Sequence, residues 1–141
     1  MNRAIKEIEA EIIDEFSLFD DWMDRYQYII EMGQNLPGLS AEDKTEENIV
    51  HGCVSQVWLK AVAKDGVLEY QADSDAVITK GLIAMLIRVL SGHAAEDIAR
   101  ADLAFVDEVG IRQHLSPNRS NGLSAMIKKM KLTAIANLSQ Q

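Results

Sequence analysis

The sequence predicts an α+β fold in which a small antiparallel sheet of about three strands is covered by helices. Three observations support this prediction. Apolar residues recur at helical spacing near both ends of the chain, and an alternating pattern begins at Val57 and continues on both sides of Asp65–Gly66. A nearly continuous apolar segment follows at residues 76–91. The 141 residues suffice for one domain with one hydrophobic core, so we expect a single domain over residues 1–141.

Two helices are expected before the sheet. In the first, the apolar residues Ile5, Ile8, Ile12 and Phe16 recur at helical spacing, with acidic residues between them. Asp20 or Asp21 can cap the second helix, because a carboxylate accepts hydrogen bonds from the free N–H groups of a first turn. Pro37–Gly38 should end it in a turn. The polar residues 40–48 then form a surface connection.

The alternating segment predicts a β-hairpin with a defined register. Asp65–Gly66 favours a two-residue type I′ turn, because both residue types tolerate positive φ. This turn places one set of apolar residues on a single face of the hairpin, namely Ala63 opposite Leu68, Ala61 opposite Tyr70, and Leu59 opposite Ala72. Residues 49–51 are expected to add a short third strand.

The segment after the hairpin predicts the central helix of the fold. Residues 73–75 (Asp-Ser-Asp) are expected to cap it, and Gly92 to end it. Aliphatic residues lie nearly all round a helix over 76–91, which is typical of a buried helix.

The remainder of the chain predicts smaller elements and one long final helix. A short helix is expected over 94–101, a less regular stretch to Gly110, and a turn over 115–118. The last helix should run from about 120 to 138. On this helix we expect Lys128, Lys129 and Lys131 to form a solvated face.

Composition narrows the class of protein. The net charge is −8 and no basic stripe follows the chain, so we expect no nucleic-acid partner. The longest apolar run, 81–87, is too short to span a bilayer, and the first residues lack the apolar core of a signal peptide. A single cysteine excludes an internal disulfide and a multi-cysteine metal site. We therefore expect a cytoplasmic protein without a membrane association.

The one cysteine, Cys53, is the leading candidate for chemistry. It follows Gly52, whose missing Cβ allows a sharp turn, and it precedes a strand, so its thiol can project from a loop tip. Val54, Val57, Trp58 and Leu59 are expected to surround it with apolar walls. Burial disfavours a thiolate, so the thiol should react only when a partner activates it. This pattern favours a carrier cysteine, but a buried cysteine with a purely structural role stays open.

Other candidate residues admit two interpretations each. His51 and Cys53 face the same way in an extended segment, as in a Cys–His dyad or half of a metal site, but an exposed loop histidine is the commoner case. His93 and His114 are expected to have no catalytic role. Arg119, at the start of the last helix, could bind a carboxylate or an anion, or could form a surface ion pair. Asp75 is first a helix cap and second a site residue.

Four blocks, taken together and in order, resemble the SufE family of sulfur acceptors. They are Tyr26–Gly33 with Leu36–Pro37, Gly52–Trp58, Asp73–Ala76 leading into Lys80–Ala84, and His114–Ser120 with Gly122–Leu123. The resemblance covers nearly the whole chain with similar spacing. It implies an α+β fold similar to that of IscU-type cluster scaffolds. Those scaffolds carry several metal-ligand cysteines, and this chain carries one.

The resemblance implies that Cys53 receives sulfur as a persulfide from a pyridoxal-phosphate cysteine desulfurase of the SufS type. It also implies that the protein stimulates this desulfurase. The sulfur then passes to an iron–sulfur scaffold complex of the SufBCD type. Gly52, Ser55, Gln56, Asp75 and Arg119 would support the site or bind the partner. The chain would hold no cofactor or metal, since the pyridoxal phosphate belongs to the desulfurase. Whether the protein has catalytic turnover of its own, and whether it forms a homodimer, are both left open.

Three rival interpretations are kept beside this one. A standalone cysteine hydrolase would release a small product without a protein partner. An interaction module would use Cys53 only for packing, so that Cys53→Ser would change nothing else. A cluster or zinc scaffold is disfavoured by the cysteine count.

Overall fold

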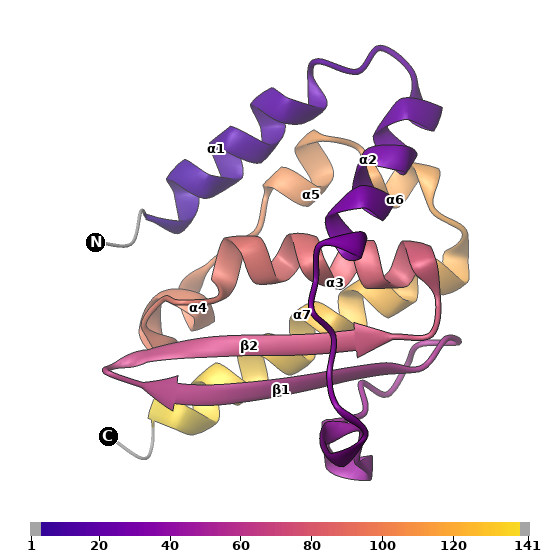
Figure 1. Ribbon diagram of the computed structural model, residues 1–141. Coiled ribbons are helices and arrows are strands. Elements are labelled where there is room, and N and C mark those ends of the chain that lie inside the picture. The colour runs from indigo at the N-terminus through magenta and orange to yellow at the C-terminus, as the bar shows by residue number, and fades with distance from the viewer. Residues whose placement is uncertain (1–3, 139–141) are drawn as a thin grey trace.

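The computed structural model describes residues 4–138 and confirms the α+β fold class. A two-stranded antiparallel hairpin packs against a set of helices (Figure 1). In chain order the elements are α1 (Ile5–Phe16), α2 (Trp22–Gln34), the 3-10 turns η1 (Ala41–Asp43) and η2 (Glu46–Asn48), β1 (Val57–Lys64), β2 (Val67–Ser74), α3 (Val77–Leu90), α4 (Ala95–Arg100), α5 (Phe105–Glu108), α6 (Ile111–His114) and α7 (Pro117–Leu138).

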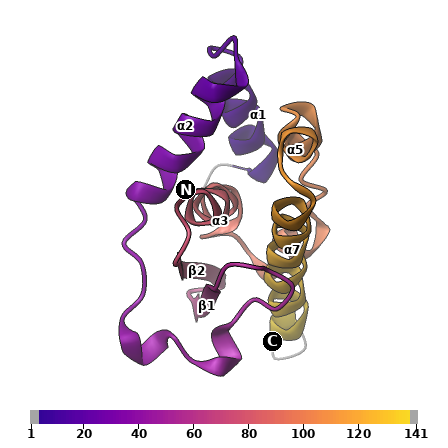
Figure 2. The same cartoon turned by 90° about the vertical axis from the view of Figure 1, so that its right-hand side faces the viewer.

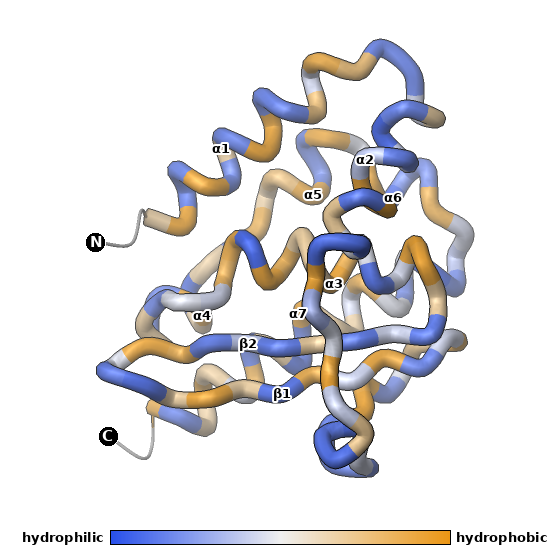
Figure 3. Tube along the Cα trace, viewed as in Figure 1, coloured by the Kyte–Doolittle hydropathy of each residue, from blue (hydrophilic) through white to orange (hydrophobic). Residues whose placement is uncertain are grey.

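Helix α3 is the centre of the molecule, as its sequence predicts. Seen along its axis in Figure 2, it lies between α2, α7 and the hairpin. Leu82, Ile83 and Leu86 on this helix are almost completely buried, whereas Ile87 is half-buried. Burial on several sides explains why this helix is apolar nearly all round, while α1 alternates between hydrophilic and hydrophobic residues along its length (Figure 3).

The hairpin has the predicted register. Ala63 pairs with Leu68, Ala61 with Tyr70, and Leu59 with Ala72. Asp65 and Gly66 adopt φ of 53° and 85°, the positive values that a type I′ turn requires. The expected third strand is reduced to a single bridge between Ile49 and Trp58, because the chain turns away into the cysteine loop immediately after Val50.

Helix α2 approaches α3 so closely that two glycines meet. A Cβ added to Gly33 would lie 2.6 Å from the backbone nitrogen of Gly81, and a Cβ on Gly81 would lie 2.1 Å from the carbonyl oxygen of Ile29. Gly33 therefore belongs to a close helix–helix contact, which explains a glycine within the last turn of α2. The start of α2 is capped by Asp21, whose Oδ1 accepts a hydrogen bond from the N–H of Asp24 (2.9 Å).

The predicted cap of α3 by residues 73–75 is wrong. Ala76 occupies the cap position, and no side chain there bonds to the first turn. Ser74 Oγ instead accepts the N–H of Ala76 (3.2 Å), and the carboxylate of Asp75 is directed to the cysteine loop. The sequence Asp-Ser-Asp resembles a cap because these residue types bond equally well to backbone N–H groups of a neighbouring segment.

Helix α7 begins three residues earlier than predicted, at Pro117. Proline suits the first position of a helix, and Ser116 Oγ accepts the N–H of Arg119 (3.3 Å) as an N-cap does. The expected solvated lysine face is also wrong in part. Lys129 and Lys131 are half-buried and donate hydrogen bonds to backbone carbonyl groups of other segments, while Lys128 is exposed. Within residues 4–138, no helix combines the length and the apolar character needed to cross a membrane.

Candidate functional site: the cysteine loop and its cavity

Cys53 lies half-buried in the loop between η2 and β1, at the edge of a cavity of about 400 Å³. Three segments that are distant in sequence form this cavity. The loop supplies Cys53, Val54 and Ser55, helix α3 supplies Thr79 and Leu82, and the start of α7 supplies the rest, namely Ser116, Asn118, Arg119, Gly122 and Met126. The cavity thus has one thiol, one cation and a partly apolar floor.

The end of the loop, directly before β1, is hydrogen-bonded to Ser74 at the end of β2 and to Asp75, the residue that follows it. The N–H of Gln56 donates to Asp75 Oδ1 (3.0 Å), and the carbonyl oxygen of Gln56 accepts from Ser74 Oγ (2.8 Å) and from the N–H of Asp75 (3.3 Å). Asp75 and Gln56 therefore fix the end of the loop and do not line the cavity.

Two glycines allow the loop to lie against α7. Gly52 has φ of +98°, a conformation that other residues rarely adopt, and a Cβ on it would lie 3.2 Å from Cβ of Ala125. Gly122 leaves room for the thiol, because a Cβ there would lie 3.3 Å from Cys53 Sγ. The thiol in turn donates to the carbonyl oxygen of Gly122 across 3.6 Å.

Burial raises the pKa of the Cys53 thiol above its ordinary value. The apolar walls differ from those expected from the sequence. Val54 lines the cavity but is 78% exposed, and Val57 is completely buried in the core. Leu82 and Met126, from α3 and α7, supply the apolar contact, and sequence position near Cys53 could not indicate them.

Arg119 is the charged residue of the cavity lining. Its Nη1 donates to the hydroxyl of Tyr26 on α2 (2.9 Å), and its guanidinium carbon lies 6.0 Å from the centre of the Tyr26 ring. The structure therefore brings Arg119, Ser55 and Cys53 together around one cavity, with Gly52 beside it. The contact between Tyr26 and Arg119 could not be predicted from the sequence, because 93 residues separate the two side chains.

The histidines lie elsewhere. None of the described residues that line the Cys53 cavity is a histidine. His51 is exposed and lines a separate hollow farther along α7, beside Ala125 and Lys129. His93 is buried and pairs with Leu68 through the backbone, and His114 stacks on Trp22 at 4.1 Å. Among residues 4–138, no group of three or more His, Cys, Asp or Glu side chains could hold a metal ion.

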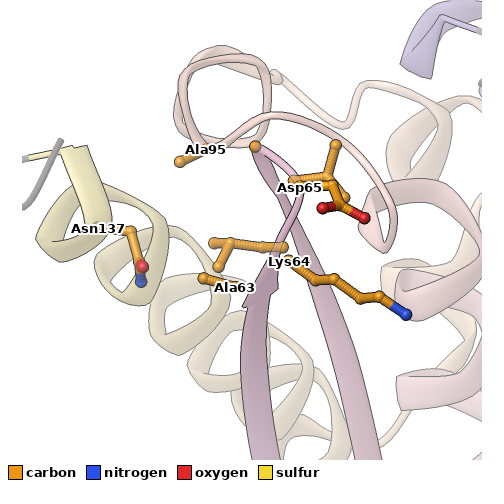
Figure 4. A pocket seen from close by; sticks show the side chains of 8 residues that line it. Ala63, Lys64, Asp65, Ala95 and Asn137 are labelled. Atoms are coloured by element: carbon orange, nitrogen blue, oxygen red, sulfur yellow. The ribbon is translucent and has the colours of Figure 1, made fainter.

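A second hollow, of about 500 Å³, lies at the tip of the hairpin (Figure 4). The turn residues Lys64 and Asp65 line it together with Ala95 and Asn137, and the Lys64 amine points away from Asn137. The described residues of its lining include no cysteine or histidine, so this hollow is a weaker candidate for a functional site than the Cys53 cavity.

The chain is similar to known proteins over most of its length. The model of the SufE family, described as an Fe–S metabolism associated domain, matches residues 10–134. An uncharacterized SufE-like protein of Rhizobium meliloti is 43% identical over 133 residues, which cover 91% of this chain and 95% of that protein. One of Rhizobium etli is 42% identical over 126 residues, covering 86% and 85% of the two chains.

A solved structure shares the fold. The solution structure of a hypothetical protein from Thermus thermophilus is similar with a TM-score of 0.78 and 19% sequence identity, over 94% of this chain and 96% of that one. The chain belongs to the SufE family. This membership connects the protein with iron–sulfur metabolism and is consistent with a role in sulfur transfer in association with a cysteine desulfurase.

Proposed function

We propose that this protein accepts sulfur on Cys53 from a pyridoxal-phosphate cysteine desulfurase of the SufS type and passes it to an iron–sulfur scaffold of the SufBCD type. The chain's one cysteine carries the proposal, because it lines a cavity that also contains an arginine. A sulfur carrier needs one thiol that is shielded from solvent in the free protein and accessible when a partner protein binds. The pyridoxal phosphate stays with the partner, and this chain needs no cofactor of its own.

The transfer is a thiol–persulfide exchange without net oxidation. The thiolate of Cys53 attacks the outer sulfur of the desulfurase persulfide, a new S–S bond forms, and the old S–S bond breaks. The desulfurase cysteine leaves as a thiolate, and Cys53 becomes the persulfide. Delivery repeats the same exchange, with a thiolate on the acceptor as the attacking group.

The surroundings of Cys53 support this role. Its pKa is raised by burial, so the resting thiol is mostly protonated near neutral pH and reacts slowly with stray electrophiles and disulfides. Leu82 and Met126 provide an apolar contact for the extra sulfur atom, which shields a persulfide from reducing thiols in solution. Activation would then come from a partner that draws the thiol out of the cavity.

A cysteine hydrolase receives less support. A hydrolase of this type needs a base within hydrogen-bond reach of the thiol, and the thiol's partner is the carbonyl oxygen of Gly122. A purely structural Cys53 also receives less support, since the core around α3 is built from fully buried aliphatic side chains while Cys53 is half-buried beside an open cavity.

Mass spectrometry tests the proposal directly. The protein is incubated with a SufS-type desulfurase and L-cysteine, without reductant, and the mass of the Cys53 peptide is measured. We expect the peptide to gain the mass of one sulfur atom, and the gain to be lost on treatment with a reducing thiol. Cys53→Ser should neither gain mass nor accelerate the desulfurase. An unmodified Cys53 beside an active desulfurase, or full stimulation by Cys53→Ser, would exclude the proposal.

A further inference from the structure

The segment that leads to Cys53 lies along one face of α7. Gly122, Ala125 and Lys129 are three and seven residues apart, which places them on the same side of the helix. Gly122 contacts Cys53, Ala125 lies next to Gly52, and Lys129 reaches the residues before the loop. The loop and the helix therefore run in opposite directions, with Cys53 at one end of the contact and Lys129 at the other.

The Lys129 end of this contact is held firmly. Lys129 Nζ donates to the carbonyl oxygens of Glu47 (3.0 Å) and Ile49 (3.1 Å), which lie in η2 and directly before the loop. Both bonds are assisted by the charge of the ammonium group, and the bond to Ile49 is also partly buried, whereas the bond to Glu47 is exposed. Independently of α7, the N–H of Val50 donates to the carbonyl oxygen of Val57 at the start of β1 (2.8 Å), which holds the same end of the segment to the sheet.

The Cys53 end is held weakly. Its bond to α7 is the thiol contact with Gly122 O at 3.6 Å, and a thiol is a poor donor. Between the two ends, Gly52 and Ala125 meet without a polar bond that would resist separation. Contact between the loop and α7 thus depends on Lys129 more than on any group near the thiol.

We propose that Lys129 is a positioning residue that clamps the base of the cysteine loop to α7 and so keeps Cys53 closed over its cavity. With the clamp in place, the loop opens from the Cys53 end and returns to the same position. Without it, the whole segment from Glu47 to Cys53 separates from α7 more easily. The inference rests on the proposed function, because the benefit of a closed loop is the shielding of a sulfur carried on Cys53.

The test compares the rate at which a neutral reagent, iodoacetamide, alkylates Cys53 in the free protein. Lys129→Met keeps the aliphatic stem and removes the donor, and we expect a rate about tenfold higher, which corresponds to about 1.4 kcal/mol in the opening equilibrium. The pH midpoint of alkylation should move down toward that of an ordinary thiol. Lys129→Arg keeps a charged donor and should retain slow alkylation.

The matched control is Lys128→Met. Lys128 is the neighbouring residue, is exposed, and loses the same charge when substituted. Removal of a cation near a thiol disfavours the thiolate and slows alkylation, so a purely electrostatic effect has the opposite sign to loop opening. We expect Lys128→Met to leave the rate unchanged or slightly lower.

Two results would overturn the proposal. One is an alkylation rate in Lys129→Met equal to that of the wild type. The other is a large fall in Tm in that variant, which would make Lys129 a support of the whole fold and not of the loop. Neither experiment uses a desulfurase, so failure here is distinguishable from failure of sulfur loading on Cys53.

Discussion

Arg119 Nη1 and the Tyr26 hydroxyl lie 2.9 Å apart, so a residue of α7 at the Cys53 cavity is tied to a residue of α2. Arg119 is exposed, and an arginine in that situation has many rotamers available in water. The tyrosine restricts them and holds the guanidinium at the cavity. This relationship makes Arg119 a suitable contact for an anionic or carboxylate group on a desulfurase.

Substitution of Arg119 by alanine is expected to affect sulfur loading and not folding. Exposed polar contacts contribute about 0–1 kcal/mol, so the Tm of Arg119→Ala should stay close to that of the wild type. A docking arginine at a desolvated interface contributes more, about 2–5 kcal/mol. The measurement is thermal unfolding together with the loading rate of Cys53 at several protein concentrations.

Arg100→Ala is the matched control for that experiment. Arg100 is an exposed arginine on α4 that pairs with Glu96 (2.7 Å), and it does not line the Cys53 cavity. We expect normal loading in Arg100→Ala. Equal loading rates in the two variants would mean that Arg119 is an ordinary surface residue. A large loss of Tm in Arg119→Ala would mean that Arg119 supports the fold.

The reactivity of Cys53 should depend on pH with a midpoint above that of an ordinary thiol. The thiolate is the reactive form, and burial disfavours it, so the folded protein must reach a higher pH before the thiolate forms. Alkylation by iodoacetamide is followed against pH in buffer and in strong denaturant. We expect the folded protein to show the higher midpoint. A midpoint at or below that of the unfolded chain would mean that a nearby group activates the thiol in the free protein.

The hairpin and the central helix could be predicted from the sequence because their signals are local. Residue alternation of period two and the Asp65–Gly66 turn together determine which residues pair across the strands. An apolar segment of about 14 to 16 residues has to be buried, and α3 is the element of that length after the hairpin. Neither prediction depends on how segments that are distant in the sequence pack against the hairpin or α3.

The cavity could not be predicted in the same way, because it depends on how α7 docks against the loop. Leu82 and Met126 line it although they are distant from Cys53 in sequence. The caps illustrate the same limit, since Asp75 bonds to Gln56 and not to the helix that follows it. Lys129 is the clearest case, because nothing in the spacing of Lys128, Lys129 and Lys131 indicates that one of them binds the backbone before the loop.

The core around α3 predicts unequal costs for two neighbouring truncations. Leu86 is completely buried, and Leu86→Ala should lower the free energy of unfolding by about 2–5 kcal/mol. Ile87, the next residue of the same apolar helix, is half-buried, so Ile87→Ala should cost clearly less. Denaturant unfolding of both variants measures the difference. Equal costs would contradict the difference in burial between Leu86 and Ile87.

Helix packing and helix propensity predict opposite effects at Gly81. In an isolated helix, Gly→Ala stabilises by about 1 kcal/mol. In this fold the new methyl group would lie 2.1 Å from the carbonyl oxygen of Ile29, so α2 and α3 would have to separate. We expect Gly81→Ala to destabilise the protein by about 1–3 kcal/mol or more. Gly122→Ala is the control, because its new methyl group would meet a single side chain, that of Cys53, at 3.3 Å. A gain of stability in Gly81→Ala would contradict the close contact between α2 and α3.

The last prediction concerns Glu9, whose side chain is buried between α1 and the start of α5. Its Oε1 accepts the N–H of Phe105 (3.4 Å). Burial raises the pKa of this carboxyl above its ordinary value of 4.5, and the nearby Asp102 and Glu108 act in the same direction, while the Phe105 N–H and Lys6 oppose them. The folded state therefore binds the proton more tightly than the unfolded state, and it loses stability as the pH rises from 4.5 through the folded pKa.

Glu9→Gln should remove this loss while keeping an oxygen that accepts the Phe105 N–H. We expect the variant to have a higher Tm than the wild type near neutral pH, and the difference between them to shrink as the pH falls toward 4.5. Glu7→Gln is the control, since Glu7 lies exposed in the first turn of the same helix. Its removal should not raise the Tm, because an acidic side chain stabilises a helix N-terminus. The measurement is the Tm of both variants and the wild type across this pH range. If Glu9→Gln is less stable than the wild type at neutral pH, the neighbours of the buried carboxylate offset the cost of burying its charge.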